Sequence, residues 1–299
     1  MSLTALFIRI TPILFVLLWS TGFIGSKMGA PYSEPLSFLT VRYAIVLLLL
    51  GGSMLVMRPA GLRSRRELGH SIVVGILIHG IYLGGVFWAI DNGMPAGIAA
   101  LIVGLQPMMT ALIAGGLLGE QITKQHWIGI ALGIFGVALV LGPKAGVSGA
   151  GINPATVAST LLAVFAITLG TIYQKRFVPN IDFRSGALYQ YIGALAVTLA
   201  GALLLEDFQI EWTGEFVFAL GWLTIVLSIG AIMLLMLLIR KGAVSKVATL
   251  FYLVPAATAI ESYFLFDEEL SLVQLVGMAI VIGAVALATR KSSAKVEPA

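Results

Sequence analysis

The sequence predicts an all-α integral membrane protein in which ten transmembrane helices form two inverted five-helix repeats. Three observations support this fold class. Apolar residues make up 59% and charged residues 11% of the 299 residues, whereas a soluble domain has roughly 45–50% and 25%. Ten apolar segments are each close to the length of about 20 residues that crosses a bilayer. The second half of the chain also resembles the first at a constant shift of 148 residues.

Hydropathy places five helices in each half of the chain. The segments of the first half are 10–27, 36–57, 69–90, 95–118 and 126–142. Those of the second half are 154–173, 184–205, 216–239, 245–266 and 272–289. We expect helices because lipid offers no hydrogen-bond partner to the backbone. The first segment is expected to be retained and not cleaved as a signal peptide, since Arg9 is its only basic flank and no clear small-residue cleavage site follows it.

The regions outside these helices are short. A Gly- and Pro-rich stretch, 142–154, is expected to link a first repeat, residues 1–148, to a second repeat, residues 149–299. Residues 292–299 form a polar tail that we expect to be disordered. These lengths leave no room for a soluble catalytic domain.

The internal repeat pairs residues that influence helix shape and packing. At the shift of 148 residues, Pro107 corresponds to Pro255, Tyr43 to Tyr191, Gly129 to Gly277, Gly22 to Gly170 and Lys27 to Lys175. Because each half has an odd number of spans, the two copies of the repeat must have opposite orientations in the membrane. Inverted repeats are typical of secondary transporters, whose substrate site lies between the halves.

Basic residues are distributed unequally across the predicted membrane. Fifteen Lys and Arg fall on the side that holds both termini, and only Lys27 and Lys144 fall on the other. The positive-inside rule therefore predicts a multi-pass protein of the cell inner (plasma) membrane with both termini cytoplasmic. The net charge of +4 reflects this topology, and no nucleic-acid partner is needed to explain it.

Three ionisable residues lie within predicted spans, and such residues are candidate functional sites because they are costly in lipid. Arg42 and Glu261 each lie about six residues from the outer end of their span, so they are expected to share a depth. They could form a structural ion pair, extend to the interface, or act as a gate or substrate contact. His79 lies near the middle of its span on one face with Tyr82. It is a candidate for lining a cavity, for proton coupling, or for a neutral contact with another helix.

Aromatic and amide side chains deep in the spans predict an amphipathic cavity for a small molecule. Trp19 lies too far inside its span for an interfacial belt, Gln106 lies halfway along the fourth span, and Tyr252 lies in the ninth. Pro107 and Pro255 should kink the matched fourth helices and act as hinges. Gly129-x-x-x-Gly133 permits close helix approach, either within the bundle or in a homodimer.

The order of these motifs resembles the drug/metabolite transporter superfamily, EamA type. The resemblance is carried by Leu17-Leu-Trp-Ser-Thr-Gly-Phe23, Phe38-Leu-Thr-Val-Arg-Tyr43, Gln106-Pro107 and Leu118-Gly-Glu120, with the latter part repeated from Pro255 to Glu269. It covers nearly the whole chain in two copies and implies ten helices with cytoplasmic termini. It also implies that the first, third and fourth helices of each half line a central cavity. The cavity residues implied are Trp19, His79, Tyr82, Gln106, Thr168 and Tyr252.

The sequence and this resemblance together favour a secondary transporter that exports small amphipathic metabolites by alternating access. Amino acids are the preferred substrate class, because the family includes exporters of aromatic amino acids. Exchange of phosphorylated sugars or nucleotide sugars is an alternative, although Arg42 is the one cation clearly within a span and phosphate usually requires several. A channel is a further alternative and would more naturally show rings of like polar residues.

An enzyme is disfavoured because the chain contains no catalytic or nucleotide-binding motif. The absence of cysteine removes thiolate nucleophiles and cysteine-bearing zinc sites. We therefore expect no cofactor and no metal, and the expected partners are a small-molecule substrate and the lipid bilayer.

Overall fold

The computed structural model describes residues 3–56, 64–118, 124–144, 151–179, 181–231, 234 and 250–288. Within these ranges the regular structure is helical, apart from one isolated bridge between Ser33 and Ile210. The helices of the first half are α1 (Leu3–Gly29), α2 (Pro35–Val56), α3 (Arg65–Gly75), η2 (Ile76–Ile81), α4 (Tyr82–Asp91), α5 (Ala96–Val103), α6 (Gln106–Leu118) and α7 (Lys124–Leu141). Those of the second half are α8 (Pro154–Phe177), α9 (Phe183–Leu205), α10 (Gly214–Gly221), η4 (Trp222–Ala231), η5 (Phe251–Leu253), α13 (Val254–Phe266) and α14 (Leu272–Ala288).

Seven helical segments in the described ranges are long and apolar enough to cross a membrane, and three shorter apolar helices lie at Gly214–Ser228, Phe251–Phe266 and Leu272–Ala288. The expectation of an all-helical, multi-pass membrane protein is therefore confirmed for this part of the chain. The count of ten crossings stays a prediction. Residues 145–150 of the expected linker and the whole expected tail, 292–299, lie outside the described residues.

Two predicted helices differ in local structure from a simple α-helix. The segment predicted over 69–90 consists of α3, η2 and α4 in succession, and η2 is π-helical. The segment predicted over 95–118 divides into α5 and α6 at Gly104 and Leu105. Proline explains the second difference, since Pro107 has no N–H to donate to Val103 and its ring excludes a continuous helix. The π-helical turn has no such signal in its own sequence.

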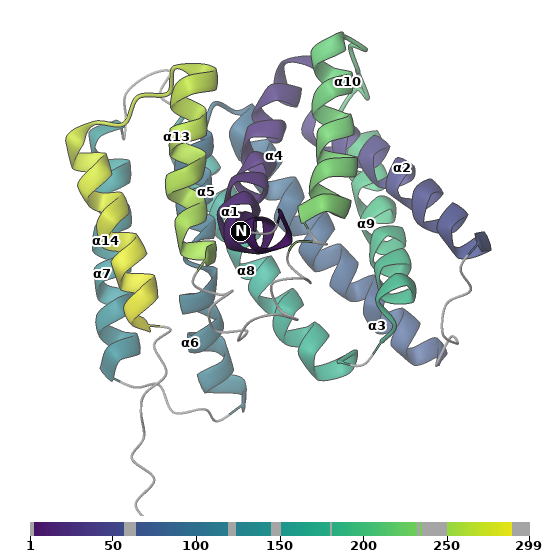
Figure 1. Ribbon diagram of the computed structural model, residues 1–299, viewed down its shortest axis with the longest axis horizontal. Helices are drawn as coiled ribbons and strands as arrows, with labels where there is room; N and C mark the ends of the chain where they lie inside the picture. Colours follow the sequence, from purple (N-terminus) through teal and green to yellow (C-terminus); the bar gives the residue numbers. More distant parts are fainter. Residues whose placement is uncertain are drawn as a thin grey trace, which may run out of the picture.

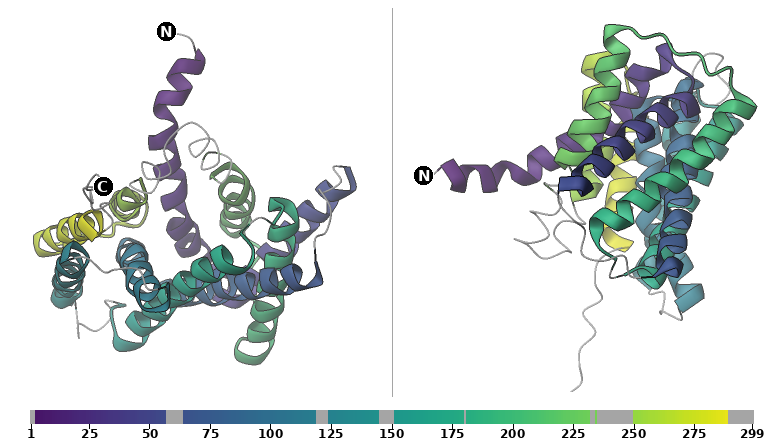
Figure 2. Two further views of the ribbon diagram at one scale, coloured as in Figure 1. Left: turned by 90° about the horizontal axis from the view of Figure 1, so that it is seen from below. Right: turned by 90° about the vertical axis from the view of Figure 1, so that its right-hand side faces the viewer.

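The helices form a curved arrangement, with α7 and α14 at one end and α2 and α9 at the other (Figure 1). Between these two ends, α1 lies beside α13 and also beside α10 and η4. The N-terminal part of α1 projects away from the remaining helices (Figure 2). The position of α1 is important for the site, because it separates the elements on its two sides.

Helices α7 and α14 approach closely through small residues and run in opposite directions. A Cβ atom built on Gly129 would lie 2.7 Å from Ala288 Cβ, and one built on Gly277 would lie 2.8 Å from Val140 Cγ2. These two contacts exchange under the shift of 148 residues, so the helices are related to each other as the two copies of the repeat are. The glycine motif for which packing in a homodimer was an alternative is therefore buried within the chain. Gly133 packs on Met108, and Gly129 packs on α14.

Carboxylates join two loops at one end of the bundle. Glu206 accepts hydrogen bonds from the backbone N–H groups of Leu36 and Ser37, both at 2.8 Å, and so caps the first turn of α2. Glu34 accepts from the N–H groups of Asp207 and Gln209, both at 3.2 Å. A carboxylate at a helix N-terminus is favoured by the free N–H groups and by the helix dipole. The start of α2 is thereby fixed relative to the end of α9.

Candidate functional site

Arg42 is buried in the first half of α2, with 5% of its surface exposed. Its Nη2 donates to the backbone oxygen of Leu223 at 3.1 Å and to Ser228 Oγ at 3.3 Å, both in η4. Its Nε has no hydrogen-bond partner in the described part of the chain. The guanidinium is therefore fixed against η4 by neutral oxygens, and its buried Nε–H is unused.

The next residue of α2 makes the corresponding contact on the opposite side. Tyr43 is fully buried, and its hydroxyl donates to the backbone oxygen of His79, in η2, at 2.7 Å. The two π-helical segments, η2 and η4, occupy matched positions in the third helix of each half, because residues 76–81 correspond to 224–229 at the shift of 148. Irregular helical turns of this kind occur frequently at functional sites.

Around His79 the structure forms an aromatic cluster from three helices. The imidazole ring stacks on Tyr191 with ring centroids 4.7 Å apart and also interacts with the side chain of Gln190. Tyr43 packs on Tyr191 with centroids 5.5 Å apart. Tyr43 and Tyr191 are repeat counterparts, so the cluster lies where the two halves meet. We call Tyr43, His79, Gln190 and Tyr191, together with Arg42 beside Tyr43 in α2, the central cluster; the hydrogen bonds of the Arg42 side chain itself are with η4.

The predicted partner of Arg42 lies elsewhere. Glu261, in α13, accepts from Ser20 of α1 at 2.7 Å, and its other carboxylate oxygen has no partner among the described residues. The direct ion pair suggested by their shared depth is therefore wrong for the described structure. The physical reason is that α1 packs against both η4 and α13 and so stands between the two charged groups.

Helix α1 contacts α13 and the segment that follows it at two levels, which are seven residues apart along the chain on each side. The inner level is the hydrogen bond between Ser20 and Glu261, and the other is an ion pair between Lys27 and Glu268. Glu268 also accepts from the backbone N–H of Ala96, at the start of α5. Seven residues are close to two helical turns, so Ser20 and Lys27 lie on one face of α1, and this face is turned toward α13 and the segment after it.

The remaining aromatic candidates lie at the other end of this contact. Trp19 packs on Phe15 and Phe251, with ring centroids 5.3 Å and 5.1 Å away. Tyr252 follows Phe251 in η5 and packs against the larger hydrophobic core, as does Tyr82 at the start of α4. Trp19 and Tyr252 are thus neighbours of the α1–α13 contact, whereas Tyr82 follows η2 directly, three residues after His79.

The polar candidates on the fourth and sixth spans form a third group. Gln106 donates to Thr110 at 3.3 Å and lies 3.5 Å from the hydroxyl of Thr171, on α8. Thr168 is fully buried and donates to Val164 of its own helix. Thr171, three residues further along α8, also donates to its own helix, and its hydroxyl is the one that accepts from Gln106.

The two matched prolines lie at helix breaks that touch each other. Pro107 is the second residue of α6 and Pro255 the second residue of α13, and each follows a short irregular or 3₁₀ segment. A Cβ atom built on Gly104, in the first break, would lie 3.3 Å from Pro255 Cγ. The prolines start helices and do not kink continuous ones, since a missing N–H costs nothing in a first turn.

The predicted residues thus fall into three groups and not one. Four residues of these groups are not among the site residues predicted from the sequence: Tyr43, Tyr191, Gln190 and Ser20. The repeat itself could have indicated the first three, because Tyr43 with Tyr191 and Arg42 with Gln190 are counterpart positions. Ser20 carried no such signal, since its role depends on the approach of α13.

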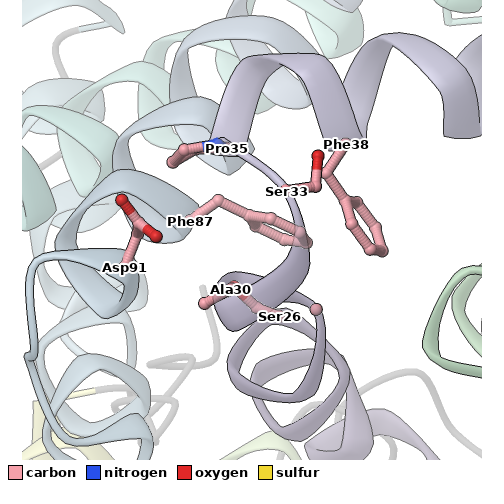
Figure 3. Close-up of a pocket in the computed structure, with 8 residues that line it drawn as sticks. Ser26, Ala30, Ser33, Pro35, Phe38, Phe87 and Asp91 are labelled. Atoms are coloured by element: carbon pink, nitrogen blue, oxygen red, sulfur yellow. The ribbon is translucent and has the colours of Figure 1, made fainter. Parts of the chain in front are cut away.

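A small pocket at the end of α1 contains none of the predicted residues. Ser26, Ala30, Ser33, Pro35, Phe38, Phe87 and Asp91 line it, and the rings of Phe38 and Phe87 occupy its centre (Figure 3). Its volume of about 10 Å³ is that of a single water site. It is too small to hold a metabolite.

A polytopic helical bundle with paired proline breaks and polar clusters deep in its spans has the architecture of a membrane transporter. The chain belongs to the EamA-like transporter family, whose model matches residues 6–142 and again residues 155–290. The family membership that the motifs indicated is therefore confirmed.

Several curated relatives extend over nearly the whole chain. An uncharacterised transporter of Bacillus subtilis (strain 168) is 27% identical over 94% of this chain and 90% of its own length. An uncharacterised inner membrane transporter of Escherichia coli (strain K12) is 26% identical over 91% of this chain and 87% of its own length. A probable amino-acid metabolite efflux pump of Escherichia coli (strain K12) is 24% identical over 90% of each chain.

A solved crystal structure has the same fold. It superposes with a TM-score of 0.63, covers 94% of this chain and 95% of that chain, and is 19% identical in sequence. At this identity the likeness concerns the fold alone.

Proposed function

We propose that this protein is a secondary carrier of the inner membrane that exports small amphipathic metabolites, above all amino acids, by alternating access. In this proposal residues 1–148 and 149–299 are inverted repeats of five helices each, and both termini are cytoplasmic. The observation that carries the proposal is the contact between the two proline breaks, at Gly104 and Pro255. Two irregular points that touch between matched helices provide a place where one half can rotate against the other.

The substrate class is supported by the chemistry of the buried groups. The polar clusters combine aromatic rings with a small number of hydrogen-bonding groups, as sites for small amphipathic molecules do. One relative is named a probable amino-acid metabolite efflux pump. Both observations favour amino acids over larger or highly charged substrates.

Exchange of phosphorylated sugars or nucleotide sugars is supported less well. Phosphate recognition usually requires paired cationic donors, and Arg42 is the buried cation within the spans that the structure describes. Lys175, at the end of α8, is exposed, and Lys246 lies outside the described residues. A channel is the alternative of a different class.

Uptake of a labelled amino-acid panel into proteoliposomes, with and without a pH gradient, tests the proposal. A carrier should give saturable, steeply temperature-dependent flux that unlabelled substrate on the opposite side accelerates. Empty liposomes and heat-inactivated protein serve as controls. Unsaturated flux or single-channel currents would indicate a channel, and selective uptake of sugar phosphates would indicate the exchanger.

A further inference from the structure

Arg42 carries a full charge that no acidic side chain offsets in the described structure. The one ion pair there joins Lys27 to Glu268, so no carboxylate lies within 4.0 Å of the Arg42 guanidinium among these residues. The groups that do contact it are a backbone oxygen and a hydroxyl. Neutral acceptors orient a buried cation, but they do not repay the cost of removing it from water as an anion does.

The guanidinium is held so that part of its donor capacity stays available. Its Nη2 is used by Leu223 and Ser228, whereas its Nε is buried and has no partner in the described ranges. Buried polar groups almost always have a partner, so an unused N–H on a nine-tenths-buried cation calls for one that comes from outside the chain. An anion satisfies both the charge and the hydrogen bond.

The surroundings of Arg42 suit an organic anion and not a bare inorganic one. Tyr43, the next residue of α2, has its ring centroid 6.3 Å from that of His79 and 5.5 Å from that of Tyr191. Tyr43 is enclosed, but His79 and Tyr82 are half-buried near the middle of the bundle. Apolar ring surface beside a fixed cation can accommodate the body of a ligand whose charged end reaches the cation.

The two copies of the repeat carry different residues at the position of Arg42. The counterpart of Arg42 in the second half is Gln190, which lies beside His79 in the same central cluster. The duplicated position thus supplies one cation and one neutral amide where two cations could have stood. One positive charge matches a monoanion, since a phosphate dianion usually requires several.

We propose that Arg42 binds the carboxylate of the substrate, with the rings of the central cluster and Tyr82 against the substrate's apolar part. The substrate class is then monocarboxylates, including amino acids, and excludes their amides and decarboxylated amines. This inference rests on the proposed transport function but assigns a ligand group and a residue that the transport proposal does not require.

Ligand-dependent thermal stabilisation of the purified protein in detergent tests the assignment without any transport step. The probes are benzoate and the twenty L-amino acids, each compared with benzamide or the corresponding amino-acid amide in a constant sodium chloride background. We expect carboxylates to stabilise the wild-type protein and their amides to fail. Equal stabilisation by the acid and its amide, or by benzoate and the same concentration of extra chloride, would overturn the proposal.

The variants are Arg42→Gln, Arg42→Lys and a matched control, Arg65→Gln, which also removes one positive charge but at an exposed position. We expect Arg42→Gln to weaken carboxylate binding by about tenfold or more, the usual effect of losing a charged hydrogen bond. Arg42→Lys, which keeps the charge, should retain a weaker preference, and Arg65→Gln should bind as the wild-type protein does. If Arg42→Gln is not monodisperse, Arg42→Lys and the wild-type comparison of acid with amide still decide the question.

The two proposals fail in different ways. Carboxylate-specific stabilisation without uptake of any amino acid would leave the Arg42 site in place and refute amino-acid transport. Amino-acid uptake with unchanged kinetics in Arg42→Gln would support transport and refute the Arg42 site.

Discussion

At the scale of single residues, the ionisable side chains of Arg42 and Glu261 form hydrogen bonds with neutral groups. Arg42 is held by a carbonyl and a hydroxyl of η4, and Glu261 by the hydroxyl of Ser20. An isolated ionisable group in a membrane span is costly, and proteins keep it where its charge is used. Because the two residues have separate partners, we expect separate roles for them, Arg42 toward an anion and Glu261 toward a proton.

Glu261→Gln tests the second role. The amide keeps an oxygen that can accept from Ser20 and removes the group that can gain or lose a proton. We expect the variant to transport at a rate that no longer depends on a pH gradient, measured as flux into proteoliposomes with and without that gradient. Ser20→Ala, which leaves the carboxyl group in place, should keep the dependence. Unchanged pH-dependent flux in Glu261→Gln would rule out a coupling role.

Gly75 shows how closely α3 approaches α9. A Cβ atom there would lie 1.8 Å from the backbone oxygen of Gln190, which cannot move without moving the helix. We expect Gly75→Ala to lower the free energy of unfolding by about 1–3 kcal/mol, as overpacking commonly does, read as a lower thermal midpoint in detergent.

Gly69→Ala is the matched control for this prediction. Gly69 lies on the same helix, and a Cβ atom there meets nothing within 4 Å. Alanine should be neutral or stabilising by about 0.5–1 kcal/mol, because it favours the helix. Equal destabilisation by both substitutions would show that the approach to Gln190 is not the cause.

At the scale of elements, the paired breaks before α6 and α13 are the feature most closely tied to transport. Each places an irregular turn next to a proline, and the two turns touch. The prolines indicated where these helices are irregular, but the predicted kinks in continuous helices are interruptions in the structure. Nothing comparable in the sequence indicated the π-helical turns η2 and η4, since their carbonyls accept from Tyr43 and Arg42 of another helix.

Pro107→Ala tests whether the break acts as a hinge. Alanine restores an N–H that could bond to Val103 and join α5 to α6. We expect a free energy of unfolding within about 1 kcal/mol of the wild-type value. We also expect a clear loss of maximal flux at an unchanged half-saturating substrate concentration. Pro154→Ala is the control, because Pro154 is also in the first turn of a helix, α8, but lies exposed and away from the breaks. Wild-type flux in Pro107→Ala would refute the hinge.

At the scale of the whole molecule, the charge asymmetry predicts which loops face the cytoplasm. The natural absence of cysteine makes this directly testable, since any thiol label must report an introduced residue. We expect Glu211→Cys to react with a membrane-impermeant maleimide in intact cells and Arg66→Cys to react only after permeabilisation. Both positions are exposed. The reverse labelling pattern would show that the topology is opposite to the predicted one. Equal labelling of both positions would contradict an orientation set by the basic residues.

Much of this protein could be read from its sequence, because hydropathy and charge fix how deep each segment lies. The free energy of moving a side chain between water and lipid depends on depth, so the approximate positions of the described apolar helices were predictable. The arrangement of the helices side by side in the plane of the membrane does not follow from hydropathy or charge. The tertiary structure alone decided that α1 separates Arg42 from Glu261 and that Tyr43, His79 and Tyr191 meet. Those neighbours are chosen by the packing of small residues and by hydrogen bonds between helices, which exist only once the helices are assembled.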